Sequence, residues 1–225
     1  MAELLLNPEI WGIVALTMRM TLMSTTISAL MGIPPGFALE RLDFPGKRII
    51  VGINRTLMGT PPVVAGLIFY LLLSRSGPLG FLGLLFTFQA MVIVQVFLIT
   101  PIICGMVYTA AARNADRIRG FAHTMGADGF QTQVLLVREL GNEIFFSLVT
   151  GFGRAMSEVG AIMMVGGNIR FQTRTMTTAI ALDVRRGFFA QGLMLGTILM
   201  IIAFAVQMAA EFFRKKERQR TDENF

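Results

Sequence analysis

The chain gathers its apolar residues into long blocks, and this feature constrains its fold more than any other. Of its 225 residues, 54% are hydrophobic, and the mean hydropathy is +0.64. A soluble domain of this length would disperse such residues with a helix or strand period. Blocks of about twenty or more apolar residues are instead the signature of membrane-spanning helices. The sequence therefore predicts an all-α polytopic membrane protein in which residues 1–225 form a single transmembrane domain.

About five transmembrane helices are predicted, and glycine-rich or charged segments separate them. The first carries Pro34-Pro35, which should kink or end it near the membrane face, because proline removes a backbone donor and clashes with the preceding turn. The second carries Pro61-Pro62, and the third contains Pro101. The predicted spans cover approximately residues 10–39, 49–73, 86–112, 143–167 and 187–213.

The basic residues predict the orientation of these spans. With the N-terminus outside, the cytoplasmic segments hold twelve Lys or Arg residues and the outer loops hold five, as the positive-inside rule requires. The C-terminal tail, residues 214–225, would then lie in the cytoplasm, where its basic residues meet anionic head groups. The first residues hold neither a basic region nor a small-residue cleavage site, so we expect no removable signal peptide. The sequence predicts a multi-pass protein of the cytoplasmic (inner) membrane.

The outer loop before the last span carries four arginines, which the positive-inside rule disfavours there. They are Arg170, Arg174, Arg185 and Arg186. One interpretation is contact with phospholipid head groups or pairing with Asp183. The other is a positive field at the outer mouth that attracts an anion. The sequence leaves both interpretations open.

Two opposite charges lie four residues apart inside the apolar, glycine-rich stretch of residues 151–168. A charge near the centre of a bilayer costs roughly 2.5 kcal/mol or more, so Arg154 and Glu158 are expected to pair one helical turn apart. We hypothesise that this pair orients a polar surface beside a pore and helps a gate to switch. The alternative is a purely structural bridge within the membrane, with Arg19 or another helix as a further partner.

Three neutral polar residues are further candidates for the transport path. Thr60, Ser157 and Asn168 could donate hydrogen bonds along it, or could be ordinary helix-packing residues. Small residues also recur every four positions, at Gly153, Ser157 and Ala161, and permit close helix packing. This stripe would pack either against a second copy of the chain or within one subunit.

The sequence lacks the residues that most enzymes need. His123 is the only histidine and Cys104 the only cysteine, so neither a multi-histidine metal site, a cysteine cluster nor an internal disulfide can form. There is no Gly-x-x-x-x-Gly-Lys-Ser/Thr motif for nucleotide phosphates. The basic residues are confined to the breaks between spans, which argues against nucleic-acid binding. We therefore expect a non-enzymatic transporter without a cofactor of its own, driven by energy from elsewhere.

The segment 113–142 is a long cytoplasmic loop, and a long loop in a compact protein is usually functional. A short helix through residues 121–125 should end at Gly126, the expected C-terminal glycine. Ala122, Gly126 and Leu136 are spaced as in the Glu-Ala-Ala loop of ABC importer permeases, which this segment resembles. The departures are Gly120 and Phe121 in place of Glu and Ala, and Arg138-Glu139 in place of Leu-Pro.

Other segments resemble the molybdate and tungstate permeases within this family. The resemblance covers nearly the whole chain and is carried by residues 60–66, 74–80, 153–160 and 166–169. The run 173–180 most resembles the tungstate branch, as does the loss of Leu-Pro.

This resemblance implies a type I ABC importer permease (MetI-like) fold and uptake of tungstate, or molybdate, by alternating access. It also implies three kinds of partner: a second copy of the chain, two cytoplasmic ATPase subunits that bind ATP and Mg²⁺, and an extracytoplasmic oxyanion-binding protein. The implied ATPase-coupling residues are Phe121, Ala122, His123, Thr124, Met125, Gly126, Ala127 and Asp128. Other functions remain open: a permease for another oxyanion such as sulfate, an ion-gradient-driven transporter, or a membrane-anchor subunit.

Overall fold

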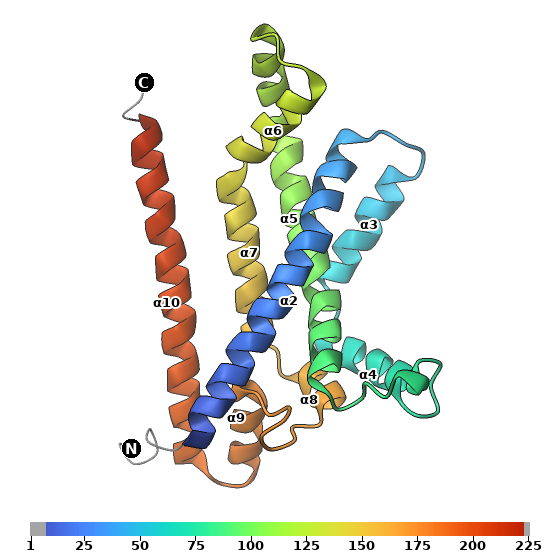
Figure 1. Cartoon of the computed structure of the whole chain (residues 1–225), viewed down its shortest axis with the longest axis vertical. Helices are drawn as coiled ribbons and strands as arrows, with labels where there is room; N and C mark the ends of the chain where they lie inside the picture. The colour runs from blue at the N-terminus through green and yellow to red at the C-terminus, as the bar shows by residue number, and fades with distance from the viewer. Residues whose placement is uncertain (1–7, 223–225) are drawn as a thin grey trace.

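Long helices that run roughly along one axis make up most of the chain (Figure 1). The computed structural model describes the backbone of residues 8–222 and the side chains of residues 8–212. In chain order the elements are α2 (Pro8–Arg41), α3 (Lys47–Met58), α4 (Pro62–Leu73), a short 3-10 turn η1 (Gly80–Leu82), α5 (Phe88–Thr124), α6 (Gly129–Glu139), α7 (Gly141–Met156), α8 (Gly160–Gly166), α9 (Met176–Arg185) and α10 (Phe189–Asp222). The predictions for a signal peptide in the first residues and for the basic side chains of the tail lie outside the described residues.

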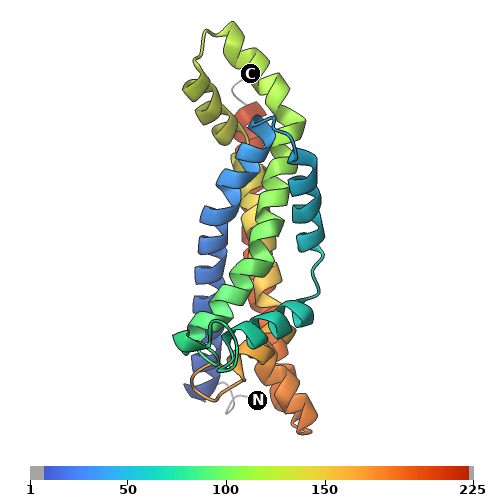
Figure 2. The ribbon, with the colours of Figure 1, turned by 90° about the vertical axis from the view of Figure 1, so that its right-hand side faces the viewer.

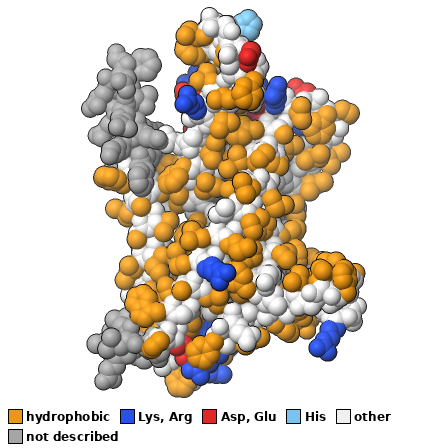
Figure 3. All heavy atoms as spheres, in the orientation of Figure 1, with side chains coloured by type: hydrophobic (Ala, Val, Ile, Leu, Met, Phe, Trp, Pro, Cys, Tyr) orange, Lys and Arg blue, Asp and Glu red, His pale blue; other side chains and the backbone are white. Residues whose placement is uncertain are grey.

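On the face shown in Figure 3, most charged side chains lie toward the two ends of the molecule, and the broad hydrophobic belt between them contains a basic side chain. We call the end formed by residues 113–142 the hairpin end, and the end formed by residues 74–87 and 168–188 the loop end. Helices α2, α5 and α10 are each long and apolar enough to span a membrane. The pairs α3–α4 and α7–α8 also qualify if each bent pair counts as one span, which gives the five spans predicted.

Helix α5 is the centre of the bundle. In its most apolar window 72% of the residues are buried, compared with 17% for α10. The Thr87 hydroxyl caps the first turn by accepting a hydrogen bond from the Ala90 amide at 3.3 Å. The predicted third span ended at residue 112, but α5 continues to Thr124. It continues because Arg and Ala, both good helix formers, recur in the charged segment that follows.

Helix α2 runs without a break through Pro34 and Pro35, so a span end at these prolines is wrong. Close packing supports the helix at this point. Gly32 and Gly36 face α5, and a Cβ atom added to Gly36 would lie 2.9 Å from the carbonyl oxygen of Cys104. The absence of side chains at these two positions lets the two helices approach closely enough to hold α2 in place.

An ion pair ties the hairpin ends of α2 and α5 together. The Arg119 guanidinium donates two hydrogen bonds to the Glu40 carboxylate, at 2.9 and 2.6 Å. The Glu40 side chain is largely buried and the Arg119 side chain is partly exposed. Bidentate pairs of this kind fix geometry as well as adding energy. The part of α5 that extends beyond the apolar belt is therefore fastened to α2.

The second span is not one straight helix. Helices α3 and α4 meet at an angle of 99°, so that α3 lies alongside α5 while α4 turns across the bundle (Figure 2). Pro61 adopts an extended conformation, with φ −62° and ψ 124°. The pair Pro61-Pro62 removes two backbone donors and disfavours the helical conformation in the residue before each proline, which breaks the helix after Gly59.

The predicted stripe of small residues at Gly153, Ser157 and Ala161 does not form one face. Helix α7 ends at Met156, and α8 departs from it at 60°. Gly153 and Ser157 are exposed, whereas Ala161 is fully buried. A Cβ atom added to Gly66 would lie only 2.7 Å from the Cα atom of Ala161. The close-packed stripe lies instead on α2, which turns Ser28, Gly32 and Gly36 toward α5.

We predict that Gly36→Ala destabilises the protein by about 1–3 kcal/mol, because its methyl group would overlap the α5 backbone at a site with no room to relax. Gly52→Ala on α3 is the matched control, since a Cβ there meets no atom within 4 Å. Thermal unfolding of the purified proteins in detergent measures the difference. Equal melting temperatures for the two variants would show that the α2–α5 contact is looser than described.

Candidate functional site

The central feature of the site is a break in the membrane-buried backbone between α7 and α8. Residues 157–159 are not helical, and the Glu158 side chain starts the next helix by accepting a hydrogen bond from the Ala161 amide at 3.1 Å. A carboxylate at a helix start satisfies a backbone donor that would otherwise have no partner. The local sequence therefore both ends α7 and begins α8.

Glu158 and Arg154 form the predicted ion pair across this break. Arg154 Nη1 lies 3.6 Å from Glu158 Oε2, and the Glu158 side chain is 4% exposed. The pair is confirmed, although its two members do not lie on one continuous helix. Arg19, the suggested further partner, instead lies over the ring of Phe88 at 5.2 Å. Two partners, the Ala161 amide and Arg154, thus compensate the Glu158 carboxylate.

Side chains from other helices satisfy the backbone carbonyls that the break leaves free. The Gln95 amide on α5 donates to the Ala155 carbonyl at 2.8 Å and accepts from the Ser24 hydroxyl on α2 at 2.6 Å. The Thr177 hydroxyl on α9 donates to the Glu158 carbonyl at 2.9 Å. Neither Gln95 nor Thr177 was predicted from the sequence. An amide side chain inside an apolar span was the signal available for Gln95.

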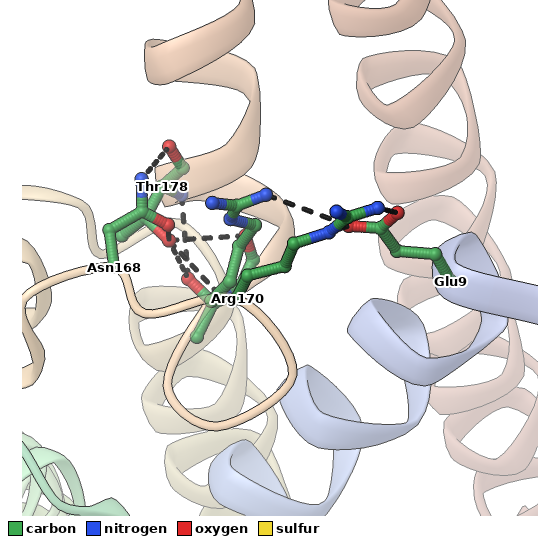
Figure 4. Close-up of polar contacts among 6 residues, drawn as sticks. Glu9, Asn168, Arg170 and Thr178 are labelled. Carbon is green, nitrogen blue, oxygen red and sulfur yellow. Dashed lines mark hydrogen bonds and ion pairs between the residues drawn. The ribbon is translucent and has the colours of Figure 1, made fainter.

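The loop that follows α8 is fixed by Asn168 and a group of buried threonines (Figure 4). Asn168 adopts a left-handed conformation, with φ 52°. Its side chain donates to the Thr178 carbonyl at 3.3 Å and accepts from the Thr178 hydroxyl at 3.0 Å. Thr175 and Thr178 form a capping box at the start of α9, and the Thr17 hydroxyl accepts from the Met176 amide at 2.9 Å. Asn168 therefore holds the loop against α9.

The outer arginines surround a carboxylate from the first span. Arg170 donates to both oxygens of Glu9, at 2.7 and 2.6 Å (Figure 4), and Arg174 Nη1 lies 3.6 Å from the same carboxylate. The suggested pairing with Asp183 is not formed by either arginine; their ion-pair partner among the described side chains is Glu9. No sequence signal predicts this contact, because the paired residues lie 161 positions apart.

These charges line a pocket of about 520 Å³ at the loop end. Arg186 and Asp183 complete its charged wall, and Phe188 and Met194 contribute apolar surface. Burial raises the pKa of the Asp183 carboxyl above its ordinary value, while the nearby Arg174 and Arg186 act in the opposite direction. The pocket therefore combines three arginines with two partly buried carboxylates, and its field is weaker than the three arginines alone would produce.

The structure brings only some of the predicted path residues together. Arg154 and Glu158 pair directly, and α9 connects Glu158 to Asn168. The Ser157 hydroxyl is exposed and bonds to the Arg154 carbonyl at 3.0 Å. Thr60 lies apart from this group, half-buried at the α3–α4 break, where its amide donates to Leu57.

At the hairpin end, the predicted helix stop at Gly126 is confirmed. Gly126 has a φ of 72°, and the Ala127 amide donates back to the Ala122 carbonyl at 3.0 Å, as in a glycine-terminated helix. The predicted short helix is not a separate element, however, because residues 121–124 are the last turn of α5. Asp128 then caps α6, with Gln131 completing a capping box.

The tip of this hairpin exposes large apolar side chains. The exposed fractions are 60% for Phe121, 72% for Met125 and 78% for Phe130. Ala122, by contrast, is buried. Phe121 and Met125 were among the predicted coupling residues, whereas Phe130 was not. Apolar side chains clustered at a polar end of a membrane protein are typical of a protein-binding surface.

Comparison with known proteins places this architecture in a family. Residues 12–219 match the family model described as binding-protein-dependent transport system inner membrane component. The chain is 39% identical over 200 residues to the tungstate uptake system permease protein TupB of Peptoclostridium acidaminophilum, covering 89% of this chain and 88% of that protein. It is 38% identical to TupB of Campylobacter jejuni, covering 84% and 80%.

A solved structure shares the fold. The inward-facing MetNI methionine ABC transporter superposes with a TM-score of 0.67 at 18% sequence identity, covering 93% of this chain and 98% of that chain. The helical architecture, the two bent spans and the family match over nearly the whole sequence lead to one conclusion. The chain belongs to the binding-protein-dependent inner membrane components, the non-catalytic permease subunits of ABC importers, which work with a separate ATPase and a binding protein.

Proposed function

We propose that this permease imports tungstate, with molybdate as the nearest alternative. The observation that carries the proposal is the 39% and 38% identity to two tungstate uptake permeases over more than four fifths of the chain. Both anions are tetrahedral, doubly charged and similar in size. Selection between them would therefore occur mainly in the binding protein that delivers the anion.

The hairpin end would face the cytoplasm and the loop end the outside. This orientation puts the N-terminus outside and the basic tail inside, in agreement with the positive-inside rule. It also puts the hairpin tip where a cytoplasmic ATPase can reach it and the arginine-lined pocket where an anion arrives. The Arg170–Glu9 pair would keep this outer surface compact while the remaining positive charge attracts the anion.

The hairpin tip would dock into the ATPase through Phe121, Met125 and Phe130. Helix α5 runs for 37 residues from this tip to the loop end, and the Glu40–Arg119 ion pair fastens it to α2. A movement of the tip would therefore shift α2 and α5 together. Rigid-body movements of this kind, driven by ATP in the partner, are how packed helices exchange between two discrete states.

Two copies of the chain would enclose the path. Helix α10 leaves most of its surface uncovered, and a groove of about 290 Å³ lies between it and α7. Gly153 lines this groove, and a Cβ there would meet nothing within 4 Å. The single chain therefore has both an uncovered helix and unfilled space beside it, which a second copy would occupy.

The break between α7 and α8 would serve as part of the gate. Its hydrogen bonds to α5 and α9 are made by side chains of those helices and can exchange without unwinding a helix. The Arg154–Glu158 pair would keep this polar segment neutral in both states. Ser157, Asn168 and Thr60 would flank the same path.

Uptake in liposomes tests the function directly. The permease, its ATPase and its binding protein are reconstituted together, and tungstate, molybdate and sulfate are supplied in separate experiments. We expect ATP-dependent accumulation of tungstate to be fastest. Accumulation of sulfate alone would contradict the assignment, and uptake without the ATPase would indicate a different class of transporter.

We predict that Met125→Asp abolishes co-purification with the ATPase, because a charge would enter an apolar docking surface. Phe81→Asp is the control, since Phe81 is an equally exposed apolar residue at the loop end, with 82% of its surface accessible. Both proteins should insert into the membrane normally. Retention of the ATPase by Met125→Asp would place the docking surface elsewhere.

We predict that Arg154→Gln and Glu158→Gln each reduce uptake more than the double variant does. A single change leaves one charge unpaired near the bilayer centre, whereas the double change removes both. A double-mutant cycle on uptake rates should give a coupling of about 0.5–3 kcal/mol, in the lower part of this range because Arg154 is partly exposed. Strictly additive losses would show that the two charges act independently.

A further inference from the structure

One face of α3 lines a pocket of about 500 Å³ in the hairpin half of the molecule. Val51, Asn54, Arg55 and Met58 point into it, at the three- and four-residue spacing of a single helix face. Helix α5 supplies the opposite wall, which includes Arg113, and α7 supplies Glu143 and Phe146. The pocket therefore contains two guanidinium groups and one carboxylate.

A hydrogen bond fixes the depth of Arg55 in the membrane. The Asn54 side chain donates to the Pro101 carbonyl on α5 at 3.1 Å. Pro101 lies near the middle of residues 88–112, a run of α5 that contains no charged residue. Arg55, the next residue after Asn54, therefore begins near the centre of the apolar belt.

Arg55 has no internal compensation for its charge. It is exposed, and among the side chains of residues 8–212 it forms neither an ion pair nor a hydrogen bond. Arg154, the other arginine of the spans near the centre, has Glu158 as its partner. An unpaired charge at this depth is stable only beside water, an anion or a lipid head group that it reaches by extending along the membrane.

Arg113 occupies the hairpin end of the same pocket. It follows Pro101 along α5 by about 18 Å, at 1.5 Å per residue, and it too forms no ion pair within the described part of the chain. The neighbouring polar groups are already used, because Thr109 and Asn114 donate to carbonyls of their own helix. The guanidinium groups are thus the free cationic donors of this pocket.

We propose that Arg55 and Arg113 form a transient site for the transported oxyanion in the inner half of the path. A guanidinium presents a planar set of donors that matches a tetrahedral dianion. Two such groups at different depths lead the anion from the centre of the membrane toward the hairpin end. Their exposure and the carboxylate of Glu143 keep binding weak, as release requires. The inference rests on the proposed oxyanion transport.

The test compares Arg55→Gln and Arg113→Gln in the reconstituted complex of permease, ATPase and binding protein. Arg48→Gln is the matched control, because it removes a positive charge from the same helix at a position outside the pocket. Uptake and ATP hydrolysis are both measured, with the anion that the wild-type complex transports fastest. We expect Arg55→Gln to lower the ratio of uptake to hydrolysis by about tenfold, Arg113→Gln to lower it less, and Arg55→Lys to recover part of it.

Two results would overturn the proposal. One is a ratio for Arg55→Gln that equals that of Arg48→Gln. The other is a defect that appears in vesicles containing phosphatidylglycerol and disappears in vesicles of phosphatidylcholine alone, which would assign Arg55 to an anionic lipid head group. If the wild-type complex transports no oxyanion, the proposed function itself fails, which is a separate outcome.

A second measurement tests the proposal if Arg55→Gln does not assemble into the complex. Arg55→Cys is made in a Cys104→Ser background, and the rate of labelling by a water-soluble thiol reagent is measured in the complex with and without tungstate. Labelling that tungstate slows supports a site in the path. Absence of labelling, or labelling that tungstate leaves unchanged, would contradict it.

Discussion

The structure depends on satisfying the backbone of a membrane helix that is interrupted. Lipid offers no hydrogen-bond partner, so non-helical backbone at this depth is tolerated only where protein groups replace water. Between α7 and α8 those groups are the Glu158 carboxylate, the Gln95 amide and the Thr177 hydroxyl. Glu158 belongs to the interrupted segment itself, whereas Gln95 comes from α5 and Thr177 from α9. The hydrogen-bonding groups of this one short segment therefore hold α5 and α9 against the end of α7. The hydrogen bond from Ser24 to Gln95 connects α2 to the same group of helices.

The arginines of the membrane region also differ in which partner, if any, compensates their charge. Arg154 is compensated within its own span by Glu158, and Arg170 is compensated at the loop end by Glu9 from the first span. Arg55 has neither kind of partner in the described chain. Because uncompensated charge in a membrane is costly, the unpaired arginine is more informative about function than the paired ones.

The spans and their order could be predicted from the sequence because apolar blocks need no knowledge of tertiary contacts. The helix stop at Gly126 was predictable for a similar reason, since a left-handed residue after a helix favours glycine locally. The pairing of Arg154 with Glu158 followed from a spacing of four residues. Each of these predictions depends on chemistry contained within a few consecutive residues.

The predictions that failed depend on contacts between distant segments. Pro34 and Pro35 were expected to kink or end the first span, but it does not end there: Gly32 and Gly36 pack against α5 and the helix continues to Arg41. Pairing with Asp183 was one interpretation of the outer arginines, but Arg170 and Arg174 pair with Glu9, which comes from the other end of the sequence. Arg55 was not among the predicted path residues, and its depth becomes clear only from the bond between Asn54 and Pro101.

The two bent spans also explain the shape of the permease. Their loop-end halves, α4 and α8, pack tightly together: a Cβ on Gly66 would lie 2.7 Å from Ala161, and one on Gly160 would lie 2.6 Å from Val63. Their hairpin-end halves, α3 and α7, instead leave the pocket that contains Arg55 between them and α5. The two bent spans are thus tightly packed against each other in their loop-end halves and separated by a pocket in their hairpin-end halves. With the hairpin end in the cytoplasm, an anion beside Arg55 would lie on the cytoplasmic side of the close contact between α4 and α8.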